Sequence, residues 1–244
     1  LHGKIIHIAL GVIAAGLGSI IVPALLLEEY TAITFLTIAA SQFRDVRNME
    51  RNTLSGLDDY ELVKRGNTYI EGIAIAFEGR NYLVILTSLI VTAIYIFSNI
   101  WFAILTVIIC IVGCRKLMSG STLKDIVDIE YVEPRFDDAG LYVDNIYIMN
   151  IGLPARQEEV LRYGMGFILK PKNFNVRTTI ANLGQRQAIL HDTAVALGVY
   201  RDSGTPALVP LAKRDLDDGR VAVFILPQEK DIQKAIKVIG NVPT

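Results

Sequence analysis

The sequence predicts an integral membrane protein in two parts. Residues 1–118 form a membrane α-helical region of about four hydrophobic helices, and residues 119–244 form a soluble α/β domain built as an α+β sandwich. Long apolar runs fill the first part, whereas 17 of the 24 Lys and Arg residues follow residue 114. After residue 118 the pattern changes to short apolar segments separated by turn residues, which is typical of a sheet with helices.

Four apolar stretches account for the membrane region. Residues 5–27 contain no Asp, Glu, Lys or Arg and are long enough to cross about 30 Å of hydrocarbon as a helix. Residues 82–98 and 100–114 nearly adjoin, which predicts a helical hairpin around Asn99. Residues 32–43 would cover only about 18 Å as a helix, so they are interfacial, re-entrant or a short shielded span.

Charge placement favours four crossings. If residues 32–43 cross, Glu28 and Glu29 lie on one side and all the flanking basic residues lie on the other, which is the positive-inside pattern. The N-terminus and the C-terminal domain are then both cytoplasmic. If the stretch does not cross, Lys4 is separated from the other basic residues. The flanking basic residues of the membrane region are Lys4, Arg44, Arg47, Arg51, Arg80, Arg115 and Lys116.

Small residues recur three and four positions apart in the first span. Gly11, Ala15 and Gly18 share one side of a helix and would let a second helix backbone approach closely in lipid. The same glycines do not fit a phosphate-binding loop, because no strand precedes them. We therefore expect them to pack helices together.

A charged segment lies between the apolar stretches. A helix expected to begin near Asn67 carries Glu71 and Glu78 on one face, at the foot of the next span. Carboxylates in that position are costly unless they are paired or hydrated. The candidate partners are Arg44, Arg47 and Arg51. Interhelical ion pairs are the favoured interpretation, and an ion or proton pathway is the alternative.

The same segment resembles a known family. The run Tyr69-Ile70-Glu71-Gly72-Ile73-Ala74, followed by Phe77-Glu78 and Arg80-Asn81-Tyr82-Leu83, is similar to the signature of the YIEGIA family. These are membrane proteins of spore-forming Gram-positive bacteria. The resemblance covers most of the chain. It implies a bacterial membrane, the inner or a spore-associated one, and a sporulation-linked role beside a small partner subunit. It implies no catalytic residues.

The sequence of residues 119–244 predicts a mixed order of strands and helices. The expected strands are residues 127–132, 141–151, 167–170, 207–213 and 220–226, and the expected helices begin at Pro154 and cover residues 176–198 and 229–239. Gly184 is the expected weak point of the long helix. This order fits a compact sandwich and lacks the regular alternation of a nucleotide-binding fold.

Few residues here point to chemistry. His191-Asp192 is the one catalytic candidate, set against an ordinary half-exposed helix histidine. The acidic residues of 128–138 are either a calcium site or a solvated strand edge. Cys110 and Cys114 read as small apolar side chains in a bilayer helix. We therefore predict no catalytic, cofactor-binding or metal-binding residues, and a net charge of −1 gives no indication of nucleic acid as a partner.

The preferred function is accordingly non-enzymatic. The chain is expected to be a sporulation-associated assembly or scaffold component in the lipid bilayer, a homo-oligomer or the binder of a small protein partner. The alternative is a pore or transporter subunit that uses Glu71 and Glu78. A membrane-anchored hydrolase is the third class.

Overall fold

The computed structural model describes residues 2–200 and 208–244. The chain divides into two compact units, which are treated separately. The helical unit comprises Leu1–Leu54 and Glu71–Ser119, and the α/β unit comprises Ser55–Ile70 and Gly120–Thr244. The domain boundary predicted after residue 118 is therefore next to the observed boundary after Ser119. The sequence pattern did not predict that Ser55–Ile70 belongs to the α/β unit.

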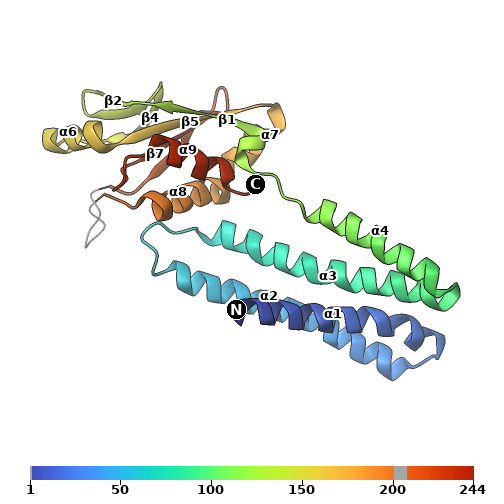
Figure 1. Ribbon diagram of the computed structural model, residues 1–244. Helices are drawn as coiled ribbons and strands as arrows, with labels where there is room; N and C mark the ends of the chain where they lie inside the picture. Colours follow the sequence, from blue (N-terminus) through green and yellow to red (C-terminus); the bar gives the residue numbers. More distant parts are fainter. Residues whose placement is uncertain (1, 201–207) are drawn as a thin grey trace. The chain divides into compact units, whose positions relative to one another are not determined.

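Four long helices make up most of the first half of the chain. They are α1 (His2–Leu26), α2 (Tyr30–Asp58), α3 (Asn67–Phe97) and α4 (Ile100–Met118). Successive helices run in opposite directions, so the α1–α2 and α3–α4 turns lie at the same end of the helical unit (Figure 1). The predicted helix start at Asn67 is confirmed.

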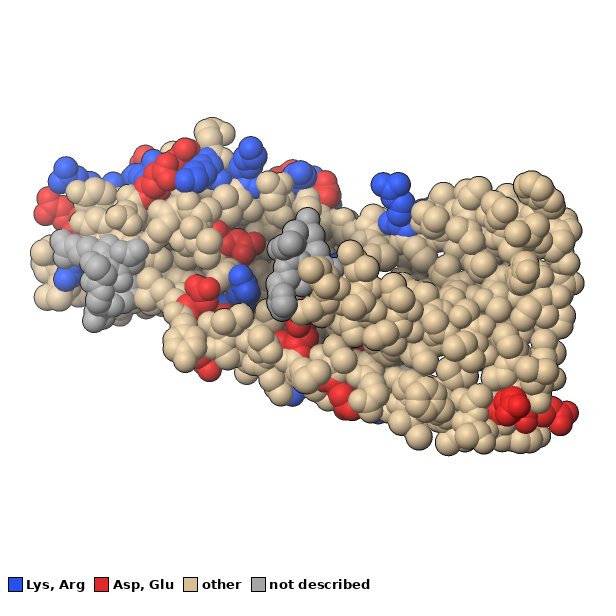
Figure 2. Space-filling view, turned by 60° about the horizontal axis from the view of Figure 1, so that its bottom comes forward, with Lys and Arg blue, Asp and Glu red and all other residues tan. Residues whose placement is uncertain are grey.

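Three of these helices are suited by length and composition to cross a membrane, in a search of the described residues. They are Ile5–Leu26, Asn67–Phe97 and Ile100–Met118. Figure 2 shows that the helical unit carries few charged side chains between its ends on the face in view. Helix α2 does not meet the same criterion, because its second half is charged.

The predicted hairpin around Asn99 is confirmed. The Asn99 side chain caps α4 by accepting hydrogen bonds from the backbone N–H groups of Trp101 and Phe102, at 3.0 and 3.2 Å. An asparagine at this position satisfies donors that the helix itself leaves open. Tyr95 and Trp101 near this turn are 57% and 75% exposed, as aromatic residues at a membrane–water interface would be.

Helix α1 contacts α3 through two of the three small residues singled out above. A Cβ atom at Gly18 would overlap the backbone carbonyl of Ile85. One turn earlier, the Ser88 hydroxyl donates a 2.6 Å hydrogen bond to the carbonyl of Ala15. Gly11 differs, because no heavy atom of the described chain lies within 4 Å of a Cβ placed there. Within the described chain the contact of α1 with α3 is therefore at Ala15 and Gly18, and packing of Gly11 against a helix of another molecule stays a prediction.

The α/β unit has three layers. A four-stranded antiparallel sheet in the order β1-β5-β7-β6 lies between a helical layer and a three-stranded sheet in the order β2-β3-β4 (Figure 1). The strands are β1 (Val127–Val132), β2 (Pro134–Asp137), β3 (Gly140–Val143), β4 (Ile146–Asn150), β5 (Met165–Pro171), β6 (Leu211–Arg214) and β7 (Val221–Ile225). The remaining helices are α5 (Leu123–Ile126), α6 (Pro154–Tyr163), α7 (Phe174–Ala181), α8 (Leu183–Leu197) and α9 (Ile232–Asn241).

The central strands are apolar on both faces because each face has its own core. Phe167 and Leu169 of β5 pack in the cluster that includes α7, α8 and α9, whereas Ile168 between them packs in the cluster with the second sheet. Strand β7 alternates in the same way and is buried at all five positions. Alternate side chains of a strand point to opposite faces, so a strand between two layers needs apolar residues throughout.

Three predicted elements are corrected. Residues 141–151 form a hairpin and not one strand, because Asp144 takes a left-handed conformation (φ 56°) that Asp tolerates and that turns the chain at Asp144-Asn145. The weak point or break expected at Gly184 in the helix over 176–198 is observed two residues earlier, at Asn182, whose side chain caps α8. The strand predicted over 207–213 is observed as Leu211–Arg214, with residue 207 outside the described residues.

The contrast between the two glycines gives a matched pair of mutations. We expect Gly18→Leu to force α1 away from α3 and to destabilise the helical unit by about 1–3 kcal/mol, because an added side chain would overlap backbone. Gly11→Leu should leave the stability of a single chain nearly unchanged. Thermal unfolding of both variants in one detergent measures the difference. Equal stability of the two variants would contradict the observed helix crossing.

Candidate functional site

An ion-pair cluster joins α2 to α3 within the helical unit. The Arg47 guanidinium contacts the carboxylates of both Glu71 and Glu78, and its Nη1 lies 3.2 Å from Glu78 Oε2. Arg51 Nη1 lies 3.7 Å from Glu71 Oε2. The Glu78 side chain is only 15% exposed and that of Arg47 is 23% exposed, so the pair is largely withdrawn from solvent.

Helix geometry explains why these residues meet. Glu71 and Glu78 are seven residues apart, which is close to two helical turns, and Arg47 and Arg51 are one turn apart on α2. Buried apolar side chains, Phe43 on α2 and Ala74 on α3, lie close to them in sequence. The structure thus brings Arg47 and Arg51 to the two glutamates. It does not bring Arg44, which forms no ion pair with any described residue.

The cluster lies about one bilayer thickness from the turn end of the helical unit. Arg47 is 17 residues beyond the start of α2 at Tyr30, and Glu78 is 19 residues before the end of α3 at Phe97. At 1.5 Å per residue these separations are about 26 and 29 Å. A hydrocarbon core is about 30 Å thick, so this is where a helix that enters at the turns would leave it.

The arrangement is suited to holding two helices together. Two guanidinium groups face two carboxylates, so the formal charges cancel, and charge-assisted hydrogen bonds fix the geometry. A carboxylate that moves protons or ions has to exchange its partner during each cycle. In this structure both glutamates are paired with arginines of α2.

His191 of α8 is buried and not half-exposed as the sequence suggested. It is 2% exposed, and its Nδ1 lies 2.7 Å from the carbonyl oxygen of Val63. The Arg65 Nε–H group donates to its Nε2 at 3.0 Å. Since Nε2 accepts, Nδ1 carries the proton and donates to Val63. Both ring nitrogens are therefore hydrogen-bonded to the segment that connects α2 to α3.

These bonds fix the connection between α2 and α3 in the α/β unit. The Asp58 carboxylate accepts hydrogen bonds from the backbone N–H groups of Arg65 and Gly66, at 2.7 and 3.0 Å. Gly66 has a φ of 83°, which favours glycine, and Val63 packs in the core of the unit. Beside this connection, burial raises the pKa of the Asp192 carboxyl, while the positive charge of Arg65 opposes that effect.

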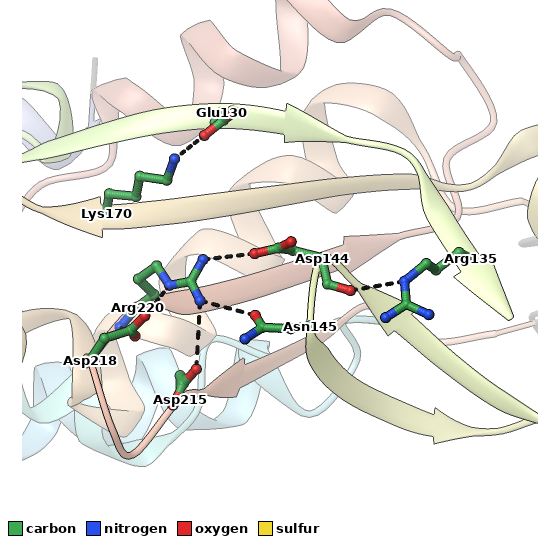
Figure 3. A network of polar contacts seen from close by, with 8 residues as sticks. All are labelled: Glu130, Arg135, Asp144, Asn145, Lys170, Asp215, Asp218 and Arg220. Atoms are coloured by element: carbon green, nitrogen blue, oxygen red, sulfur yellow. Dashed lines mark hydrogen bonds and ion pairs between the residues drawn. The ribbon is translucent and has the colours of Figure 1, made fainter. Parts of the chain in front are cut away.

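A second polar network joins two turns of the α/β unit (Figure 3). Arg220 Nη1 lies 2.7 Å from Asp144 Oδ2, and Arg220 Nη2 donates to Asn145 Oδ1 at 2.9 Å. Arg220 also pairs with Asp218 and, at 3.8 Å, with Asp215. These contacts, led by the Asp144 hydrogen bond, raise the pKa of Arg220. The network ties the β6–β7 turn to the β3–β4 turn, which sequence reasoning missed because the turns are far apart in the chain.

Two of the acidic residues of 128–138 engage lysines on or just after the neighbouring strand β5. Glu130 pairs with Lys170 across the β1–β5 ladder, and Asp128 lies 3.8 Å from Lys172. No group of three or more His, Cys, Asp or Glu residues that could hold a metal ion is found among the described residues. Cys114 Sγ lies 3.6 Å from the Thr87 hydroxyl, at the contact of α4 with α3.

The cluster predicts a specific pattern of compensation. Arg47→Gln leaves two partly buried carboxylates without their main partner, so we expect the unfolding midpoint in detergent to fall by several degrees. Adding Glu78→Gln should restore part of the loss, because one uncompensated charge is removed. Arg44→Gln is the matched control on the same helix and should behave as the unmodified chain. Additive effects of the Arg47 and Glu78 mutations would mean that the contact carries no coupling energy.

Comparison with known proteins agrees with the signature described above. The family model described as YIEGIA protein matches residues 1–244. A relative from Bacillus subtilis (strain 168), described as uncharacterized protein YphB, is 69% identical over 243 residues, which cover 100% of this chain and 82% of the relative. No solved structure matches. The resemblance carried by the Tyr69–Ala74 run is confirmed, and the chain belongs to the YIEGIA protein family.

Proposed function

We propose that this chain is a non-enzymatic membrane scaffold, associated with sporulation, that self-associates or binds a small partner subunit. The observation that carries the proposal is the engagement of Glu71 and Glu78 by Arg47 and Arg51. A locked helix pair supports a structural role. The histidine of the α/β unit, with both ring nitrogens bonded, adds no sign of hydrolytic chemistry.

The membrane arrangement that we propose has four crossings. Helix α2 is continuous from Tyr30 to Asp58 and returns alongside α1, and its charges begin to be paired about one bilayer thickness from the turn. These features support a crossing by α2 in spite of its short apolar part. In this arrangement the α1–α2 and α3–α4 turns are outside, and the N-terminus and the α/β unit are cytoplasmic.

Cysteine labelling tests this topology. In a chain with Cys110→Ser and Cys114→Ser, a single cysteine at Glu29 should react with a membrane-impermeant maleimide added outside the cell. A single cysteine at Ser119 should react only after the cells are opened, because it follows the basic end of α4. Labelling of position 29 from the cytoplasmic side alone would remove the fourth crossing.

The rival function is a pore or transporter subunit that uses Glu71 and Glu78. It requires that the carboxylates face water in some state, and the ion pairs argue against it. Proteoliposomes with the full chain should show no flux of protons, Na⁺ or K⁺ above empty vesicles. A flux that Glu78→Gln abolishes and Arg44→Gln preserves would establish the rival in place of the scaffold.

The scaffold also predicts association. The purified chain should run as more than one copy, or with a co-purified small subunit, when its mass is measured by light scattering with the detergent subtracted. The same measurement on Gly11→Leu tests one surface, because Gly11 has no close neighbour within the described chain and is available to another helix. A single copy without a partner at all concentrations would contradict the scaffold.

A further inference from the structure

An apolar groove runs along α3 in the helical unit, between α1 and α4. It has a volume of about 350 Å³. Its length follows the turns of α3 from Arg80 to Val91, about 16 Å at 1.5 Å per residue. Contacts on both sides define its walls: α1 meets α3 at Ala15 and Ser88, and α4 meets α3 at Cys114 and Thr87. Its lining includes Ala15, Arg80, Val84, Val91, Val107 and Ile111.

One end of the groove is basic. Arg80 is exposed, is the one charged residue that lines the groove, and makes no ion pair with any described residue. Arg115 lies one turn beyond Ile111 on the same side of α4, and Lys116 follows it. Arg80 is 17 residues before the end of α3, or about 26 Å, so it lies near the edge of a hydrocarbon layer that begins at the α3–α4 turn.

We propose that this groove binds one anionic phospholipid of the cytoplasmic leaflet. An acyl chain fills the apolar length, and the phosphate lies against Arg80 at the mouth. The occupant of a groove that opens sideways into a bilayer has to be apolar along about 16 Å. Charge complementarity at the basic mouth requires that it be anionic there, and a guanidinium binds phosphate through two parallel hydrogen bonds. The inference uses the membrane placement of α1, α3 and α4, and it is independent of the scaffold role.

A helix from a second copy is the other occupant that would fill an apolar groove. It would need an acidic residue at the depth of Arg80 to match the charge. Glu71 and Glu78 are already engaged, and Glu28 and Glu29 lie at the α1–α2 turn, the end of the unit opposite the mouth. Asp45 and Glu50 of α2 lie nearer the depth of Arg80, but each adjoins an arginine in the sequence, so α2 of a second copy would also bring positive charge to the basic mouth. Charge therefore favours the lipid.

The test measures lipid retention by the full chain in detergent, by native mass spectrometry and by the shift of the unfolding midpoint. The probes are phosphatidylglycerol and phosphatidylcholine with identical acyl chains, and glycerol phosphate without chains. We expect phosphatidylglycerol to be retained about fivefold better than phosphatidylcholine, since one basic residue near a charged headgroup is worth about that factor. Arg80→Gln should remove this preference, and Arg80→Lys should keep most of it.

A second pair of variants addresses the apolar length. Ile111→Phe fills the groove and should reduce retention of both phospholipids. Ile109→Phe, on an exposed face of α4 outside the groove, is the control for added bulk, and Arg214→Gln in β6 is the control for lost charge. Each variant is used only if it runs as a single species with the midpoint of the unmodified chain in lipid-free detergent. A negative result in the lipid-retention test would not change the flux and mass measurements that test the scaffold.

Four results would overturn the proposal. They are equal retention of the two phospholipids, unchanged preference in Arg80→Gln, stabilisation by glycerol phosphate equal to that by phosphatidylglycerol, and unchanged retention in Ile111→Phe. Cys110 and Cys114 line the groove and are the two cysteines of the sequence. Efficient cross-linking of these cysteines between copies in native membranes would assign the groove to a second chain instead.

Discussion

The free energy of placing charge in hydrocarbon is the constraint on which the helical unit depends. Helices α1 and α4 meet it by carrying no charge along their apolar lengths. In the proposed four-crossing arrangement, the charged second half of α2 requires a neighbouring helix that supplies carboxylates at the matching depth. Helix α3 supplies them as Glu71 and Glu78. The packing of α2 and the composition of the family signature are therefore two consequences of one electrostatic requirement.

The connection between α2 and α3 has a second determinant. Its residues are held by backbone hydrogen bonds to Asp58 and by the buried ring of His191, inside the α/β unit. The boundary between the units thus falls within α2 and within α3, after Leu54 and before Glu71. The arrangement of α2 and α3 therefore depends on two sets of interactions. One is the ion pairs of the helical unit, and the other is the hydrogen-bonded loop of the α/β unit. A residue that looks catalytic in sequence, a lone histidine beside an aspartate, is explained by this anchoring role.

How much the sequence predicted follows from the range of the interactions involved. Hydrocarbon length, the position of Asn99 and the seven-residue spacing of Glu71 and Glu78 are local or periodic signals, and the elements that depend on them were predicted. The hairpin at Asp144 was missed because apolar residues continue on both sides of a two-residue turn. The contacts of Arg220 with Asp144 and Asn145, and those of His191, were missed because the partners lie 75 to 128 residues away in the chain. The sequence also predicted a contact at Gly11 that is not observed within the described chain. The spacing of small residues does not reveal where along their lengths two helices cross.

The signature segment also separates two roles by direction. Glu78 and Arg80 are two residues apart, which on a helix is a rotation of about 200°, so their side chains leave α3 on nearly opposite sides. Glu78 faces α2 and is paired, whereas Arg80 lines the groove between α1 and α4 and is not. If both residues served one ion pathway, they would have to share a side of the helix. Their opposite directions are explained if Glu78 forms a contact between two helices and Arg80 forms a contact between protein and lipid. In the proposed arrangement the signature segment therefore serves helix packing through Glu78 and lipid binding through Arg80.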